Sequence, residues 1–150
     1  NLYKLHGSIS WSKNGGAIYE SGLNLFDKNV ERSMVLPRRR KVMDTLSNPY
    51  DQLFTKAARM LGTQCKFLVS CGFSFGDKHI NDQLLCPKLE SGSIRLFALC
   101  GEEPENLDIF KAHSPFHAGF PSKCYVDQTE SDDGTELWKF SELAKFLNPR

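Results

Sequence analysis

The spacing of apolar residues predicts alternating helices and strands over most of the chain. Apolar positions recur at helical spacing over residues 50–61, after the start signal Asn48-Pro49 and before the stop signal Gly62. Further on, the pattern predicts strands over residues 66–71, 94–100 and 123–127, and helices over residues 79–85, 105–112 and 137–147, the first closed before Pro87. This alternation is typical of an α/β fold with a Rossmann-like parallel sheet and helices on both faces.

The first part of the chain gives fewer signals. Residues 2–8 are expected to form a strand that ends in a turn of small residues, and residues 11–19 a hairpin around Asn14-Gly15-Gly16. Ligands of such sheets bind at the carboxyl ends of strands. We therefore expect the two candidate loops, residues 5–8 and 71–81, to follow strands. The basic run at residues 38–41 is interpreted as a solvated face rather than a nucleic-acid patch.

Composition narrows the function classes. The chain has 150 residues with 40% hydrophobic content, enough for one domain with a core, and a formal net charge of +1. Neither a nucleic-acid nor a membrane partner is expected, since no apolar run approaches about 20 residues and no signal peptide is visible. The five cysteines include no Cys-x-x-Cys pair and are interpreted as reduced thiols of a cytoplasmic protein.

No metal site is expected from the histidines. His113 and His117 are four residues apart, but Pro115 lies between them and disfavours a helix that presents both. The two tryptophans, Trp11 and Trp138, are expected to be core or interface anchors rather than platforms for a substrate.

The first candidate motif is Lys4-Leu5-His6-Gly7-Ser8. A histidine near neutral pH can accept a proton from a hydroxyl group, which suits a general base. The small residues Gly7 and Ser8 would let a ligand approach the backbone closely. Taken alone, the motif favours the alternative interpretation, in which His6 is a hydrogen-bonded structural residue.

The second candidate motif, Gly72-Phe73-Ser74-Phe75-Gly76-Asp77-Lys78-His79-Ile80-Asn81, directly follows a predicted strand. Glycines and a serine between a strand and a helix can form a cradle for phosphate or ribose. The spacing Gly-x-x-x-Gly differs from the Gly-x-Gly-x-x-Gly dinucleotide fingerprint. A turn in which Asp77 caps the following helix is an equally good interpretation.

Together, Leu5-His6-Gly7-Ser8 and the Gly72–Asn81 motif resemble the sirtuin-like NAD-binding family. The resemblance is closest to the bacterial sirtuin-like domains of antiviral-defence proteins, and it covers about residues 2–100. Pro37, Lys41 and the helix start Pro49-Tyr50 are also similar to the linking segment of those domains.

The resemblance implies roles for individual residues. His6 matches the catalytic histidine, and Gly72 and Ser74 match the Gly-x-Ser that contacts the phosphates and ribose of NAD. Asp77, His79 and Asn81 match a pattern of the defence-type branch. The resemblance assigns no role to these three residues. The NAD-binding residues expected in this chain are Gly7, Ser8, Gly72, Phe73, Ser74, Asp77, His79 and Asn81.

Departures from the family pattern indicate which activity to expect. Protein-deacylating sirtuins carry a four-cysteine zinc module after the histidine motif, but residues 9–64 contain no cysteine. We therefore expect no zinc, and we disfavour deacylation of acyl-lysine peptides. The family's glycine-rich first turn and catalytic asparagine would precede Asn1, so this chain is expected to be the C-terminal portion of one sirtuin-like domain.

The resemblance thus implies an NAD glycohydrolase that releases nicotinamide and ADP-ribose, with NAD as substrate and antiviral NAD depletion as its purpose. The alternative is a non-catalytic domain that binds NAD or ADP-ribose as a sensor. Related defence domains form homo-oligomers or work beside a helicase or another effector subunit, so partners of these kinds are expected.

Overall fold

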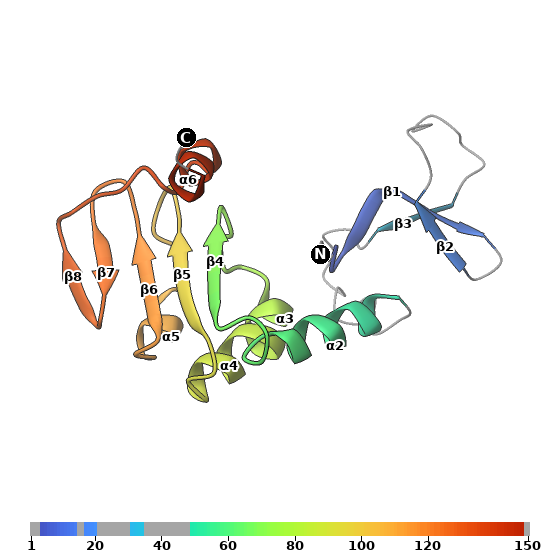
Figure 1. Cartoon of the computed structure of the whole chain (residues 1–150), viewed down its shortest axis with the longest axis horizontal. Coiled ribbons are helices and arrows are strands. Elements are labelled where there is room, and N and C mark those ends of the chain that lie inside the picture. Colours follow the sequence, from blue (N-terminus) through green and yellow to red (C-terminus); the bar gives the residue numbers. More distant parts are fainter. Residues whose placement is uncertain (1–3, 15–16, 21–30, 35–48, 149–150) are drawn as a thin grey trace. The chain divides into compact units, whose positions relative to one another are not determined.

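The computed structural model describes residues 4–14, 17–20, 31–34 and 49–148 of the 150-residue chain (Figure 1). The chain divides into two compact units, Asn1–Ala58 and Arg59–Arg150. Pro37 and the basic run at residues 38–41, Lys41 included, lie outside the described residues.

The first unit contains an antiparallel sheet in the order β2-β1-β3, formed by β1 (Gly7–Asn14), β2 (Ala17–Glu20) and β3 (Glu31–Met34). Asn14 pairs with Ala17, which confirms the predicted hairpin. Helix α2 (Tyr50–Met60) begins where the sequence indicated, and Tyr50 and Phe54 are buried. The Tyr50 hydroxyl lies 2.8 Å from the Ser33 hydroxyl, which ties this helix to β3.

The second unit is a mixed α/β layer built on a five-stranded sheet in the order β4-β5-β6-β7-β8. Its strands are β4 (Phe67–Cys71), β5 (Arg95–Leu99), β6 (Phe116–Gly119), β7 (Cys124–Val126) and β8 (Thr129–Ser131). The first three are parallel, whereas β7 and β8 are antiparallel. The sheet is compatible with a Rossmann-like fold. The predicted parallel arrangement holds for β4, β5 and β6 but not for β7 and β8, because a short antiparallel hairpin follows β6.

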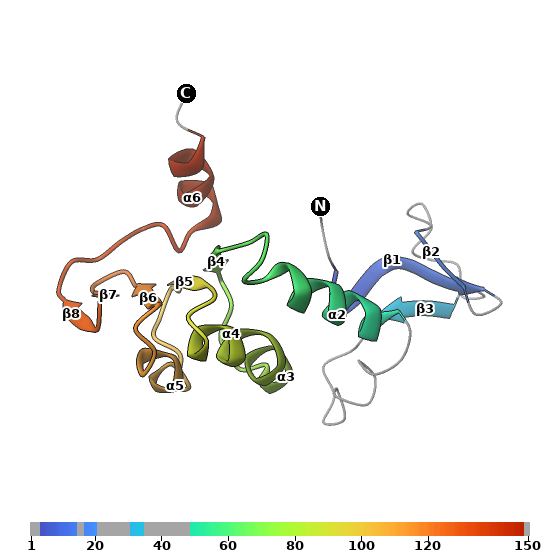
Figure 2. The ribbon, with the colours of Figure 1, turned by 60° about the horizontal axis from the view of Figure 1, so that its bottom comes forward.

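Helices lie on both sides of this sheet (Figure 2). One side carries α3 (Lys78–Ile80), a π-helical turn η1 (Asn81–Leu85), α4 (Cys86–Glu90) and α5 (Asp108–Lys111), and the other carries α6 (Phe140–Leu147). No helix within the described residues is long and apolar enough to span a membrane.

The sequence predicted a helix that ends before Pro87, but the helical segment after β4 continues past this residue. The Cys86 amide donates to the Asn81 carbonyl, five residues back, so the chain makes one π turn before Pro87. Pro87 then occupies the first turn of α4, where a missing N–H leaves no helical bond unmade.

The core of the second unit lies between the sheet and the helices α3 to α5. In-register rows of β5 and β6 supply Leu96, Ala98, Phe116 and Ala118, all buried. Phe110 of α5 packs against them and is fully buried. Burial of one such aromatic side chain stabilises a fold by about 3 kcal/mol.

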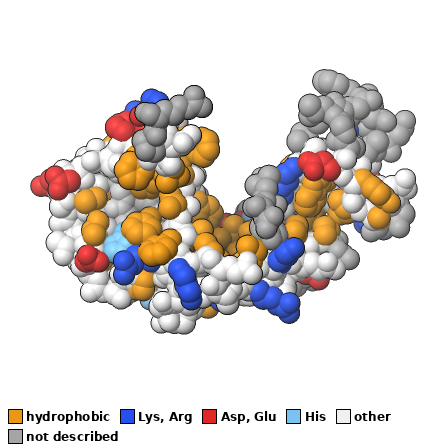
Figure 3. Space-filling view, in the orientation of Figure 1, with side chains coloured by type: hydrophobic (Ala, Val, Ile, Leu, Met, Phe, Trp, Pro, Cys, Tyr) orange, Lys and Arg blue, Asp and Glu red, His pale blue; other side chains and the backbone are white. Residues whose placement is uncertain are grey.

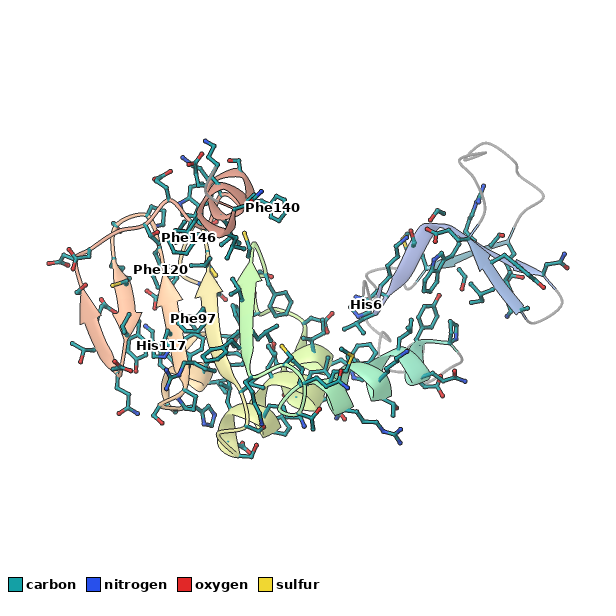
Figure 4. All side chains as sticks on the ribbon, in the orientation of Figure 1. His6, Phe97, His117, Phe120, Phe140 and Phe146 are labelled. Carbon is teal, nitrogen blue, oxygen red and sulfur yellow. The ribbon has the colours of Figure 1, made fainter. Side chains whose placement is uncertain are left out.

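The opposite side of the sheet keeps apolar side chains at the surface, below α6 (Figure 3). Phe67 is 66% exposed on β4, although the short apolar run at residues 66–71 is typical of a buried strand. On the same side Phe97 stacks on His117, with ring centroids 5.0 Å apart (Figure 4). Helix α6 begins at Phe140 rather than at Leu137, and its Phe140 is 76% exposed.

The core assignment predicts that Phe110→Ala destabilises the protein far more than Phe140→Ala does. Loss of the fully buried ring removes apolar contacts and leaves a cavity, at a cost of about 3–5 kcal/mol in the free energy of unfolding. The exposed ring should cost less than about 1 kcal/mol. Urea denaturation of the two variants checks this, and equal losses would contradict the assigned core.

Candidate functional site

The loop after β4 begins with a backbone turn that only glycine adopts freely. Gly72 has a φ of +72°, in the left-handed region. Its amide donates to the Leu99 carbonyl at 3.1 Å, so the loop starts beside the end of β5. The carboxyl ends of β4 and β5 therefore lie together, as the parallel register of Cys71 with Leu99 requires.

Phe75 anchors the middle of this loop. Its backbone has a φ of +55°, which is rare for a bulky residue, and its side chain is fully buried. The ring lies 4.9 Å from both the Phe73 and the Phe110 rings. Such a backbone conformation costs about 1–2 kcal/mol, and burial of the ring offsets that cost.

Asp77 and Asn81 hold the end of the loop. The Asp77 carboxylate accepts hydrogen bonds from the His79 and Ile80 amides, at 3.2 and 3.5 Å, and caps α3. The Asn81 side chain is 8% exposed, and its amide donates to the Phe75 carbonyl at 2.6 Å. The capping role considered for Asp77 is therefore confirmed, and Asn81 fixes the backbone of the anchoring residue.

A pocket of about 850 Å³ opens beside this loop. It is lined by residues 72–74, 76, 100–106 and 138, and we call it the strand-end pocket. Gly72, Phe73 and Ser74 lie in its wall, whereas Asp77, His79 and Asn81 do not. The structure thus brings together three of the predicted binding residues and places two others, Asp77 and Asn81, as supports of the loop.

Backbone donors are available at this loop. No hydrogen bond from the amides of residues 73–76 to another protein group occurs within the described part of the chain. Successive unpaired amides in a loop provide fixed partial positive charge, which favours an anion or the oxygen atoms of a sugar. Such an arrangement suits a phosphate group that is bound by backbone amides and not by a lysine or arginine side chain.

Trp138 was expected to be an anchor, and the structure places it in the wall of the strand-end pocket. A Cβ atom at Gly101 would lie 3.2 Å from the indole ring, so glycine allows the ring to lie close to the loop. The segment before α6 therefore completes the pocket, about 65 residues after the loop that begins it.

The pocket rim also carries an ion-pair network. The Glu103 carboxylate pairs with the ammonium groups of Lys111 and Lys123, the latter at 2.6 Å. The hydrogen bonds from Lys111 and then Lys123 hold the pKa of Glu103 below its ordinary value. Lys123 in turn pairs with Glu130 of β8 at 3.2 Å, which links the rim to the terminal hairpin.

His6, Gly7 and Ser8 belong to the first unit. His6 lies in a turn directly before β1, so residues 4–6 do not form part of the predicted strand, and residues 2 and 3 of that prediction lie outside the described residues. The strand instead starts at Gly7, which pairs with Met34. The His6 ring lies 6.0 Å from the Phe54 ring of α2. Ser8 accepts a hydrogen bond from the Lys4 ammonium at 3.3 Å.

The two remaining histidines occupy separate structural settings. His113 follows α5, whereas His117 is buried in β6, where its Nδ1 accepts a hydrogen bond from the Asp127 amide at 3.3 Å. Burial lowers the pKa of His117. No cluster of three potential metal ligands occurs within the described residues.

Sequence reasoning missed residues 100–106 and Trp138 as pocket residues. The loop after β5 could have been found, because neighbouring parallel strands present their carboxyl ends at one edge. Nothing in the sequence around Trp138 indicates that this ring returns to the same edge.

The Glu103 network predicts a specific dependence of stability on pH. Because its folded pKa lies below the unfolded value of about 4.5, the stabilisation is present above that pH and is lost as the pH falls. Glu103→Gln should lower the free energy of unfolding by about 1 kcal/mol at pH 7 and change it little at pH 3. Thermal melts at both pH values test this, with exposed Glu90→Gln as control; a pH-independent loss would refute the role of the network.

The chain matches no protein-family model, and no curated protein sequence matches it. The resemblance to sirtuin-like domains therefore depends on the quoted motif residues. Of the residues in these motifs, the strand-end pocket is lined by Gly72, Phe73, Ser74 and Gly76.

Proposed function

We propose that the protein is a sirtuin-like NAD glycohydrolase, which cleaves NAD to nicotinamide and ADP-ribose. The observation that carries the proposal is the strand-end pocket with the Gly72–Gly76 loop in its wall. Its volume of about 850 Å³ lies within the range typical of small-molecule and cofactor sites. The loop amides would donate hydrogen bonds to the phosphate oxygens, because they have no other acceptor within the described residues.

The reaction breaks the bond between the nicotinamide nitrogen and the ribose carbon. Nicotinamide leaves with the bonding electrons, a water oxygen forms the new bond to that carbon, and the water gives up a proton. Cationic charge develops on the ribose in the transition state. His6 is assigned to orient the ribose and to accept a proton from a hydroxyl group or from water.

The biological setting belongs to the same proposal. We assign the activity to antiviral defence by NAD depletion in the cytoplasm, within a homo-oligomer or beside an effector or helicase subunit. These assignments come from the resemblance of Leu5-His6-Gly7-Ser8 and of the Gly72–Asn81 motif to the defence-type domains. Deacylation remains disfavoured, because residues 9–64 lack the cysteines of the zinc module.

A second candidate function is binding of NAD or ADP-ribose without turnover. All residues that line the strand-end pocket belong to the second unit, whereas His6 belongs to the first. Binding at the pocket is therefore separable from chemistry at His6. A domain of this kind would bind the nucleotide and thereby control the activity of a neighbouring effector.

Nicotinamide release from NAD by the intact protein distinguishes the two functions. His6→Ala should lower the rate by about 100-fold or more, because a positioned acid or base contributes at least that factor. His113→Ala, which changes a histidine outside both motifs, serves as the matched control. Release by His6→Ala at the wild-type rate would overturn the role of His6, and ADP-ribose binding with no release from the wild type would favour the sensor.

A further inference from the structure

The tip of the β7–β8 hairpin has an unfavourable backbone conformation. Its two turn residues, Asp127 and Gln128, have φ values of +50° and +63°, in the left-handed region. Turns of this kind usually contain asparagine and glycine, because contact between Cβ and the following carbonyl oxygen disfavours longer side chains there. A contact from outside the turn therefore matters for the stability of the tip.

His117 of β6 supplies such a contact. Its Nδ1 accepts a hydrogen bond from the Asp127 amide at 3.3 Å. The imidazole is 6% exposed and stacks on Phe97 of β5, with an angle of 27° between the ring planes (Figure 4). An imidazole nitrogen accepts a hydrogen bond only while it carries no proton. The bond to the hairpin tip thus requires neutral His117 with its proton on Nε2.

Within the described residues, the charged groups that act on His117 are the Asp127 carboxylate at the hairpin tip and the Arg95 guanidinium on β5. Burial lowers the pKa of His117, an effect that Asp127 opposes and Arg95 increases. Because the folded pKa lies below the ordinary value of 6.5, the stabilisation is fully present above that pH. It is lost as the pH falls through the folded value.

The same hairpin contains one member of the ion-pair network at the pocket rim. Glu130 of β8 pairs with Lys123 at 3.2 Å, and Lys123 also pairs with Glu103 in the wall of the strand-end pocket. Strand β8 has three residues, lies at the edge of the sheet, and buries none of its side chains. Such a strand opens at a low free-energy cost. A change at the hairpin tip can therefore reach the pocket rim through Glu130.

We propose that His117 is a pH-sensitive latch, whose protonation at Nδ1 releases the tip of the β7–β8 hairpin and thereby separates Glu130 from Lys123. The added proton faces the amide hydrogen of Asp127, so two donors meet where a donor and an acceptor met before. The charged ring also requires water, which an open hairpin admits. This latch is independent of the proposed function, because it needs no bound nucleotide.

The test records backbone amide NMR signals of the 150-residue chain from about pH 8 to about pH 5, the range in which histidine changes its charge. The amides of Asp127 and Glu130 should shift with one common midpoint, below pH 6.5. Hydrogen exchange of the hairpin, corrected for its intrinsic pH dependence, should rise by about tenfold, because loss of one hydrogen bond changes an opening equilibrium by that factor. His117→Asn should abolish both responses, since its Oδ1 lies as many bonds from the backbone as Nδ1 and accepts at every pH. His113→Asn is the matched control and should keep them.

Each outcome supports or overturns the latch. Responses that persist in His117→Asn, or a midpoint of about pH 4 that belongs to the Asp127 carboxylate, would overturn the assignment to His117. A shift at Asp127 without one at Glu130 would overturn the link to the pocket rim. If His117→Asn does not fold, the ring signals of His117 in the wild type decide. Their midpoint must coincide with that of hairpin exchange, and constant exchange while the ring titrates would refute the latch.

Discussion

The second unit depends on one unfavourable backbone conformation that the core stabilises. Phe75 adopts the left-handed region, and its fully buried ring packs against Phe73 and Phe110. The ring cannot leave the core without opening a cavity, so the loop cannot relax to a commoner conformation at low cost. The positions of Gly72, Ser74 and Gly76 in the pocket wall follow from this anchor.

Such an anchor explains why the loop contains aromatic residues between its small ones. A loop of glycine and serine alone would have to be ordered by the ligand, which would lower the affinity. The bond from Asn81 to the Phe75 carbonyl adds a second constraint from the π turn. The pocket wall is therefore set before a ligand binds.

The sequence predicted most elements of the second unit, because its periodicities are strong. It identified β4, β5, β7 and the loop after β4 within a few residues, as it did α2 of the first unit. It missed β6, since Phe116–Gly119 contains a histidine and a glycine in place of a continuous apolar run, and it missed β8, which is a short polar edge strand. Both belong to the sheet through their neighbours, which local pattern does not encode.

For the candidate site, too, the sequence predicted some residues and missed others. Gly72, Phe73 and Ser74 were found because they follow a strand and precede a capped helix. Trp138 and the rim at residues 100–106 reach the pocket through tertiary packing. The turn at His6 was misassigned because Gly7 and Ser8, which indicate a turn by composition, instead start β1 through pairing with β3.

The π turn between α3 and α4 fixes the number of residues that this segment can contain. It places Asn81 where its side chain bonds to the Phe75 carbonyl. It also places Pro87 in the first turn of α4, where a proline is tolerated. Loss of one residue from this turn would restore ordinary helical bonding but rotate either Asn81 or the buried Leu89 by about 100°. Point substitutions are thus more readily accommodated here than changes in chain length, and homologous chains that keep this pocket should conserve the spacing between Asn81 and Pro87.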